Sequence, residues 1–278
     1  MQTPEFISFW ITSGLYFLTF VAGLFHAFFP KKFWERSCLW SLWFGCLSHS
    51  VTFGLRWHYA QHWPVGNMYE LNLFGSLVTM LILLIMQRLT KNHLIYVVAL
   101  TSFIVAGTLL VGLLLDPSIK PLSAAYDSYW LFVHVFFAWF AFGCFTIATA
   151  FAGVYLAKAR KPEFLPQFYT PAALDQFAYK LIALGVFFHL IMVVSGAIWA
   201  KNLWGAYWSW DALETWSLIV VIYYLIYLHA RSFWQIKGTL AAWMLVLGLV
   251  ILAISFWGLP LIVPNAHLQS PMDSLRPK

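Results

Sequence analysis

Eight long apolar stretches constrain this chain more than any other feature of its sequence. Their approximate bounds are 6–29, 37–57, 68–87, 94–115, 129–157, 177–200, 212–231 and 239–263. A helix needs about 20 predominantly apolar residues to cross a bilayer. The stretches show no regular alternation of apolar and polar residues and are too long for strands, which favours helices over a β-barrel. The sequence therefore predicts an all-α, polytopic membrane helix bundle with eight transmembrane helices.

Composition excludes a soluble protein. Only 9% of the residues are charged, whereas soluble domains carry about 25%. The sequence contains no internal repeat and no low-complexity segment, and its longest polar connections are about 116–128 and 158–176. We therefore expect one membrane-embedded domain, 1–278.

The basic residues predict the orientation, because they gather in the loops on the inner side of a membrane. If the first helix begins outside, eleven lysines and arginines fall on the inner side and five on the outer side. We therefore expect both termini outside. This bias accounts for the net charge of +6, so nothing calls for nucleic acid as a partner. The start, MQTPEF, lacks the basic residues of a cleavable signal and suggests an uncleaved first helix.

The segment WGAYWSWD (204–211) is an unusually aromatic connection between the sixth and seventh stretches. Tryptophan and tyrosine are enriched where helices meet the membrane surface, which offers a purely structural explanation. Asp211 and Glu214 have the spacing of a capping box and predict the start of the seventh helix. However, the tryptophans are concentrated in one loop, and Gly205 would let the backbone approach a flat ligand closely.

Two histidines fall at the depth of this loop. His134 lies about five residues inside the outer end of the fifth stretch, and His267 lies just beyond the eighth. Heme iron takes axial ligands from both faces of the porphyrin, and the ring packs on aromatic surface. Either histidine alone would be explained as a hydrogen-bonded residue near a helix end. Together, beside a tryptophan-rich loop, they suggest an iron porphyrin site.

Three further histidines lie within the predicted helices. His229 is near the inner end of the seventh stretch, where an ionisable side chain is either functional or reaches the interface beside Arg231. His26 has a similar depth in the first stretch. His49 lies nearer the middle of the membrane.

The remaining histidines and the cysteines have weaker patterns. His58 and His62 are four residues apart, but no third metal ligand is near them. His189 lies within the sixth stretch and receives no role. The cysteines lack metal or redox spacing and are expected to be small buried residues; they are Cys38, Cys46 and Cys144.

Four segments resemble CcsA-type (ResC-like) cytochrome c assembly proteins and occur in that family's order. The most specific, SGAIWAKNLWGAYWSWDALETWSLIVVIYYLIYLHAR, resembles the family's tryptophan-rich signature. RWHYAQHWPVGNMYELNLF (56–74) is similar to the family's outer segment ahead of the third helix. YWLFVHV resembles the start of the fifth helix, and His267 falls where the family has its second external histidine.

The resemblance implies a protein that handles heme b as cargo. Such proteins work with a CcsB-like membrane partner, move heme outward and present it to CxxCH motifs of apocytochrome c, as the core of a heme lyase. The external iron ligands, which would also be the catalytic residues, carry over to His134 and His267, and the inner ligand carries over to His229. The heme-holding surface carries over to Trp204, Gly205, Trp208, Trp210 and Asp211.

The chain departs from the family's pattern in two respects. The family's WDPKETW reads WDALETW here, so Leu213 replaces a basic residue; Arg56, Lys201 and the amino end of the seventh helix are alternatives for binding propionates. No CcsB-like segment is present, so a second inner ligand would come from a separate chain or from His26. His49 is too far outward to share the inner iron, and it is kept as a candidate for a different site.

As a hypothesis, heme meets His229 near the inner leaflet and is then held outside by His134 and His267, in position for attachment to the CxxCH thiols. The expected location is a bacterial inner membrane, with a thylakoid as the alternative. Other functions remain open at this point: a heme exporter or chaperone without attachment chemistry, a heme-containing anchor of a redox complex, or a regulator of heme synthesis.

Overall fold

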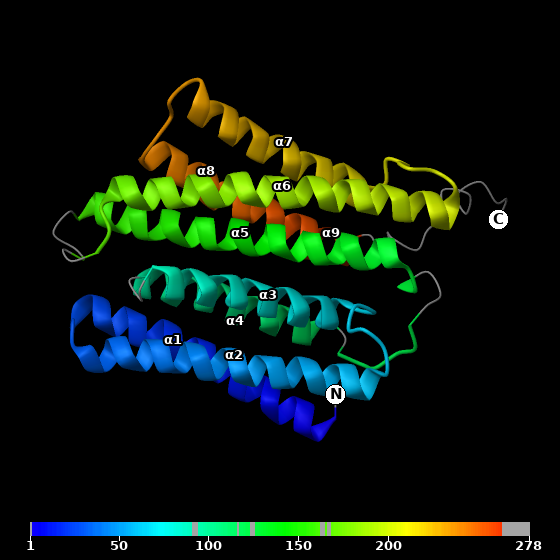
Figure 1. Cartoon of the computed structure of the whole chain (residues 1–278), viewed down its shortest axis with the longest axis horizontal. Helices are drawn as coiled ribbons and strands as arrows, with labels where there is room; N and C mark the ends of the chain where they lie inside the picture. Colours follow the sequence, from blue (N-terminus) through cyan, green and yellow to red (C-terminus); the bar gives the residue numbers. More distant parts are fainter. Residues whose placement is uncertain are drawn as a thin grey trace.

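The computed structural model describes residues 2–90, 94–115, 117–122, 126–161, 165 and 168–262. These residues form eight long helices that run up and down along one axis (Figure 1). They are α1 (Thr3–Phe28), α2 (Lys32–Ala60), α3 (Met68–Leu89), α4 (Ile95–Leu114), α5 (Tyr129–Arg160), α6 (Pro171–Trp204), α7 (Ala212–Ser232) and α8 (Thr239–Ala253). The last continues through a π-helix, η2 (Ile254–Gly258), into α9 (Leu259–Ile262).

Each predicted apolar stretch corresponds to one of these helices, so the predicted all-α membrane bundle is confirmed. The clearest difference lies in the connection expected at 158–176. Thr170 caps α6 by accepting a hydrogen bond from the Ala173 N–H, and Pro171 occupies the first turn, where its missing N–H costs nothing. The helices α5 and α6 are therefore 32 and 34 residues long. At 1.5 Å per residue each is about 50 Å long, more than a bilayer core of about 30 Å requires.

The helix α2 is the least apolar of the eight. Seven of the described helices are long and apolar enough to cross a membrane by length and composition, and α2 is not among them. Its polar residues face α1, where hydroxyl groups pair across the interface: Ser8 with Thr52 at 2.7 Å and Thr12 with Ser48 at 2.9 Å. Apolar side chains occupy the outer face of α2 instead. Such hydroxyl pairs join neighbouring helices in membranes.

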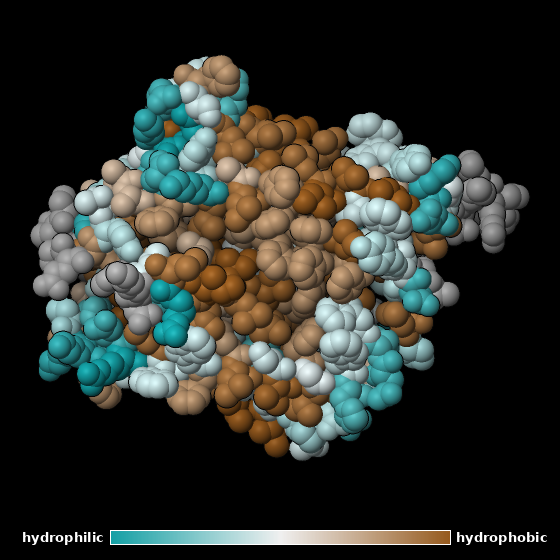
Figure 2. Space-filling view, viewed as in Figure 1, coloured by the Kyte–Doolittle hydropathy of each residue, from teal (hydrophilic) through white to brown (hydrophobic). Residues whose placement is uncertain are grey.

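The surface agrees with a membrane-embedded bundle. Figure 2 shows apolar residues around the middle of the molecule and hydrophilic residues toward both ends of its long axis. We call the end where α6 meets α7, at 205–211, the tryptophan end. We call the opposite end, where α7 meets α8 at 233–238, the basic end. The tryptophan end is the one predicted to face outward.

The helix α7 packs less closely on the bundle than its neighbours do. In its apolar window 22% of the residues are buried, compared with 72% in α3. Figure 1 shows α7 at one edge of the bundle, inclined to α6, while α1 and α2 form the opposite edge. Much of α7 is therefore available to contact lipid or another protein.

Candidate functional site

We call residues 204–211 the tryptophan loop. It begins at the end of α6, where the backbone conformation requires glycine. Gly205 has a φ of +84°, a left-handed conformation that glycine adopts without steric cost. Its N–H donates to the Lys201 carbonyl at 3.0 Å, and Lys201 Nζ donates to its carbonyl at 2.7 Å. Nothing lies within 4 Å of a Cβ built at this position. The turn, rather than crowding, is what requires glycine here.

The loop ends in the predicted capping box. The Asp211 carboxylate accepts from the Glu214 N–H at 2.7 Å, and the Glu214 carboxylate accepts from the Asp211 N–H at 3.4 Å. Glu214 also accepts from the Ser209 N–H at 2.6 Å. These bonds satisfy N–H groups that a helix start leaves unpaired. The two carboxylates hold the loop against the first turn of α7.

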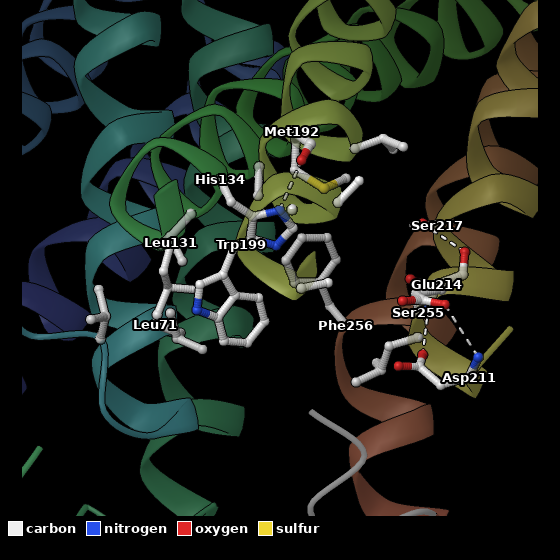
Figure 3. A pocket seen from close by; sticks show the side chains of 18 of the residues that line it. Leu71, Leu131, His134, Met192, Trp199, Asp211, Glu214, Ser217, Ser255 and Phe256 are labelled. Carbon is white, nitrogen blue, oxygen red and sulfur yellow. Dashed lines mark hydrogen bonds between the residues drawn. The ribbon is translucent and has the colours of Figure 1, made fainter. Parts of the chain in front are cut away.

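A cavity of about 320 Å³ lies beneath this loop. Its walls come from α5, α6, the start of α7, η2, the start of α3 and residues 65–67 just before it. Figure 3 shows His134, Trp199 and Phe256 together on one side of it. The other side is polar and carries Asp211, Glu214, Ser217 and Ser255.

The cavity brings together three segments that are far apart in the sequence. The segment Val65–Met68 belongs to the 56–74 motif, Leu131 and His134 belong to YWLFVHV, and the third segment is the tryptophan loop. All three were singled out by the resemblance to CcsA-type proteins. Their convergence makes this cavity the candidate functional site.

His134 is held in a defined orientation. Its Nδ1 lies 2.9 Å from the Met192 carbonyl oxygen on α6. A carbonyl oxygen only accepts hydrogen bonds, so Nδ1 carries the proton, and in the neutral ring Nε2 carries the lone pair. Gly196 makes room for this ring, because a Cβ there would lie 2.5 Å from Nδ1. The neutral imidazole therefore has the tautomer that suits it to bind a metal through Nε2.

His189 also lines this cavity. It is 4% exposed, and its Nε2 lies 3.2 Å from the Ser217 carbonyl oxygen, which links α6 to α7. Sequence reasoning assigned it no role. One signal in the sequence could have indicated that His189 lines the cavity. It lies seven residues before Gly196, so both residues share one face of α6.

The tryptophans of the loop do not all face the cavity. Trp204 and Trp208 line it, and their indole N–H groups are buried without an acceptor among the described residues. Trp210 is 70% exposed and packs edge to face on Trp208, with the ring centroids 5.8 Å apart. Neither Trp210 nor Gly205 lines the cavity. Tyr126, from the connection between α4 and α5, also lines the cavity. Burial raises the pKa of its hydroxyl, which stays protonated at neutral pH.

The two cations considered for propionate binding differ in their surroundings. The guanidinium of Arg56 is completely buried and lies 2.8 Å from Glu70 and 3.5 Å from Glu5. It also donates to the carbonyls of Pro117 and Ser118. Of the three alternatives for binding propionates, Arg56 is therefore the least suited, because its charge is already compensated by Glu70 and Glu5. Lys201 is exposed beside the loop.

His229 lies at the basic end, away from the cavity. Its side chain is exposed, and its ring stacks on Phe233 with the centroids 4.3 Å apart. His26 cannot share an iron with it in the same chain, since α1 and α7 form opposite edges of the bundle (Figure 1). His26 instead lies 3.1 Å from the Tyr96 hydroxyl.

His49 is a structural residue. Its Nε2 lies 3.0 Å from the Leu73 carbonyl oxygen, and its Nδ1 lies 3.0 Å from the Tyr16 hydroxyl. The carbonyl requires a proton on Nε2, so Nδ1 of the neutral ring accepts from the tyrosine. Both nitrogens are used in joining α1, α2 and α3. The structure thus removes His49 as a candidate ligand.

The histidines of RWHYAQH do not form a metal site either. Both nitrogens of His62 face carbonyl oxygens, at 2.8 Å from Trp63 and 3.1 Å from Lys120. His58 is exposed and packs against Tyr59. Within the described ranges, no group of three histidine, cysteine or acidic side chains has the arrangement of a metal site. The three cysteines are buried and free, as predicted. His267 lies outside the described residues, so its proposed role stays a prediction.

Known proteins resemble this chain in both sequence and fold. It is similar to the cytochrome c biogenesis protein CcsA of Lactuca sativa at 29% identity, over 76% of this chain and 79% of that protein. The CcsA protein of Guillardia theta is 26% identical over 96% of this chain and 98% of its own length.

The solved structure of the cytochrome c heme lyase CcmF has a similar fold. Its TM-score is 0.70 at 16% identity, over 92% of this chain, which spans about half (47%) of the length of that protein. The family model described as cytochrome C assembly protein matches residues 65–267. That range includes the whole lining of the cavity. The chain therefore belongs to the cytochrome c assembly protein family, as a CcsA-type member.

Proposed function

We propose that this protein carries heme b to the outer face of the membrane and presents it to the CxxCH motif of apocytochrome c. The observation that carries the proposal is the cavity beneath the tryptophan loop, which His134 lines together with Trp204 and Trp208, its Nδ1–H donating to the Met192 carbonyl. As a family member, the protein acts in the biogenesis of c-type cytochromes.

The lining of the cavity fits a porphyrin. Aromatic side chains offer the surface on which a macrocycle packs. The indole N–H donors of Trp204 and Trp208 lack acceptors among the described residues, and propionate oxygens would supply them. Lys201, whose Nζ is 2.7 Å from the Gly205 carbonyl, supplies a positive charge at the loop. In this proposal His267 binds the iron from the face opposite His134.

The role of the chain in the attachment reaction is to position the reactants. The tryptophan loop and His134 would hold the porphyrin so that its vinyl groups face the two thiols of CxxCH, and each thiol adds across one vinyl group. Fixed orientation of this kind contributes a large part of a rate enhancement. The histidine of CxxCH must finally replace one external ligand, so His134 or His267 must bind exchangeably. On this basis the chain is the core of a heme lyase.

A separate membrane partner would complete the inner heme site. His229 is exposed, and it follows the exposed side chains of Ile222 and Ile226 along one face of α7. Beyond it, Phe233 is 74% exposed. We propose that a CcsB-like protein packs on this face and brings a second histidine to the iron. The membrane would be a bacterial inner membrane, with the tryptophan end outside.

Absorption spectra of the purified protein test the outer site. The wild type should contain low-spin, six-coordinate heme, and His134→Ala and His267→Ala should each lose or alter that spectrum and abolish cytochrome c maturation. Added imidazole should restore maturation by replacing the missing ligand. His58→Ala is the control, because that exposed side chain lies at the same end without lining the cavity.

Three other results would change the proposal. Normal cytochrome c maturation in both single variants would refute the assignment of the external ligands. A spectral change confined to His229→Ala would place the observed heme at the inner site. Wild-type protein that delivers heme without forming thioether bonds, even with its partner, would make it an exporter rather than a lyase.

A further inference from the structure

At the basic end, a groove lies on the side of α2 and α3 that faces away from the bundle. It is separate from the proposed heme sites. It has a volume of about 400 Å³ and is lined by Arg36, Leu39, Trp40, Trp43 and Arg88. The four α2 residues follow each other at helical spacing and therefore share one face of that helix. Arg88 joins them from the last turn of α3.

The groove carries two positive charges, and no acidic group among the described residues pairs with either of them. Among the described residues, no carboxylate lies within 4.0 Å of the guanidinium of Arg36 or Arg88, and Glu35, next to Arg36 in the sequence, pairs with neither. The Arg88 guanidinium lies over the Trp43 ring, 5.5 Å from its centroid. A cation on an aromatic face is attracted to it and held in place. The groove is therefore ready to receive an anion.

The surroundings of the groove are those of a lipid-facing surface. Trp40 is 61% exposed, and farther along the same helices Phe44 and Ile85 are 53% and 60% exposed. Exposed apolar side chains of this kind contact acyl chains in a bilayer. Arginine and tryptophan at the end of such a surface lie at the depth of the headgroups. A lipid with an anionic headgroup has the chemistry that matches both the two arginines and this apolar surface.

We propose that this groove binds an anionic phospholipid, with its phosphate between Arg36 and Arg88. Guanidinium groups bind phosphate oxygens through paired hydrogen bonds, which makes arginine well suited to this headgroup. The exposed rings of Trp40 and Trp43 contact the glycerol and the upper part of the acyl chains. The predicted orientation places the groove in the inner leaflet. This inference does not depend on the proposed role in heme attachment.

Native mass spectrometry of the detergent-solubilised protein tests the proposal. Dioleoyl phosphatidylglycerol and dioleoyl phosphatidylcholine would be titrated separately into the wild type and into the double variant Arg36→Gln/Arg88→Gln. Removal of two basic residues should weaken phosphatidylglycerol binding by about 10- to 30-fold. Binding of phosphatidylcholine should change little.

The matched control is Lys31→Gln/Lys32→Gln. These lysines lie at the same end of the molecule and are exposed, but they do not line the groove. The control removes the same charge and should keep tight phosphatidylglycerol binding. Equal losses in the two double variants would overturn the proposal in favour of a diffuse surface charge. Equal binding of both lipids by the wild type would overturn it as well, and so would a loss of bound heme from the arginine variant in place of lipid.

Discussion

At the scale of single residues, the position of the His134 ring depends on the absence of a side chain at Gly196. A Cβ at Gly196 would lie 2.5 Å from His134 Nδ1 and 2.9 Å from Cε1. Gly196→Ala should therefore displace the imidazole, break its bond to Met192 and remove most of the low-spin heme spectrum. Gly107→Ala is the control, because nothing lies within 4 Å of a Cβ there. Both changes raise helix propensity by about 1 kcal/mol, so similar spectra would show that this contact does not position His134.

Arg56 acts at the same scale, but on stability. It joins α1, α2 and α3 to the segment 117–118 through Glu5, Glu70 and two carbonyl groups. Loss of one partner of a buried ion pair leaves an uncompensated charge and costs about 3–5 kcal/mol. We expect Arg56→Gln to lower the unfolding temperature in detergent markedly. Arg160→Gln, at an exposed site, should have little effect, and equal effects would argue against the network.

At the scale of elements, the start of α7 sets the shape of the tryptophan loop. Asp211→Ala removes the cap and should cost about 1 kcal/mol, with weaker heme binding in a titration because the loop loosens. Asp211→Asn keeps the cap and should bind heme normally. Thr170→Ala removes the corresponding cap from α6 at the basic end and should leave heme binding unchanged. A defect in Asp211→Asn equal to that in Asp211→Ala would show that the carboxylate charge matters instead of the cap.

Element boundaries were predictable only where a local signal was recognised: the capping box predicted the start of α7 at Ala212, whereas the start of α6 at Pro171 was expected at about 177. The capping residues Thr170 and Asp211 and the glycine after Trp204 act within one helical turn of their own positions. The interior of α8 was less predictable. It gives way to a π-helix at Ile254–Gly258, which brings Ser255 and Phe256 to the cavity. No local pattern indicated this change, and such π-helical turns are frequent at functional sites.

At the scale of the whole molecule, orientation can be measured with single cysteines. The three native cysteines are buried, so they should contribute little background. Asn202→Cys is exposed at the tryptophan end and Lys237→Cys at the basic end. With the tryptophan end outside, a membrane-impermeant maleimide should label the first on intact spheroplasts and the second only after lysis. The opposite pattern would reverse the predicted topology.

The candidate site was predictable only in part. Of the candidate site residues, His134, Trp204, Trp208 and Asp211 line one cavity, whereas Gly205 and Trp210 do not. The place of His189 in the cavity lining was not anticipated, and Arg56, one of three candidates for binding propionates, is buried in an ion-pair network. Both differences have one cause. A sequence gives the depth of a residue along a helix, but not the neighbour toward which its side chain points.

By itself, the sequence determined that the chain is a helical membrane bundle, roughly where its eight helices lie, and which family it resembles. These depend on the length of apolar stretches, on capping residues and on local motifs. Only the tertiary structure decided which histidines meet the cavity and which are structural, as for His189 and His49. Membrane helices are apolar on nearly all faces, so hydrophobic periodicity carries little information about which face turns inward. The face that turns inward is set by packing between helices, so it cannot be read from the sequence of any one helix.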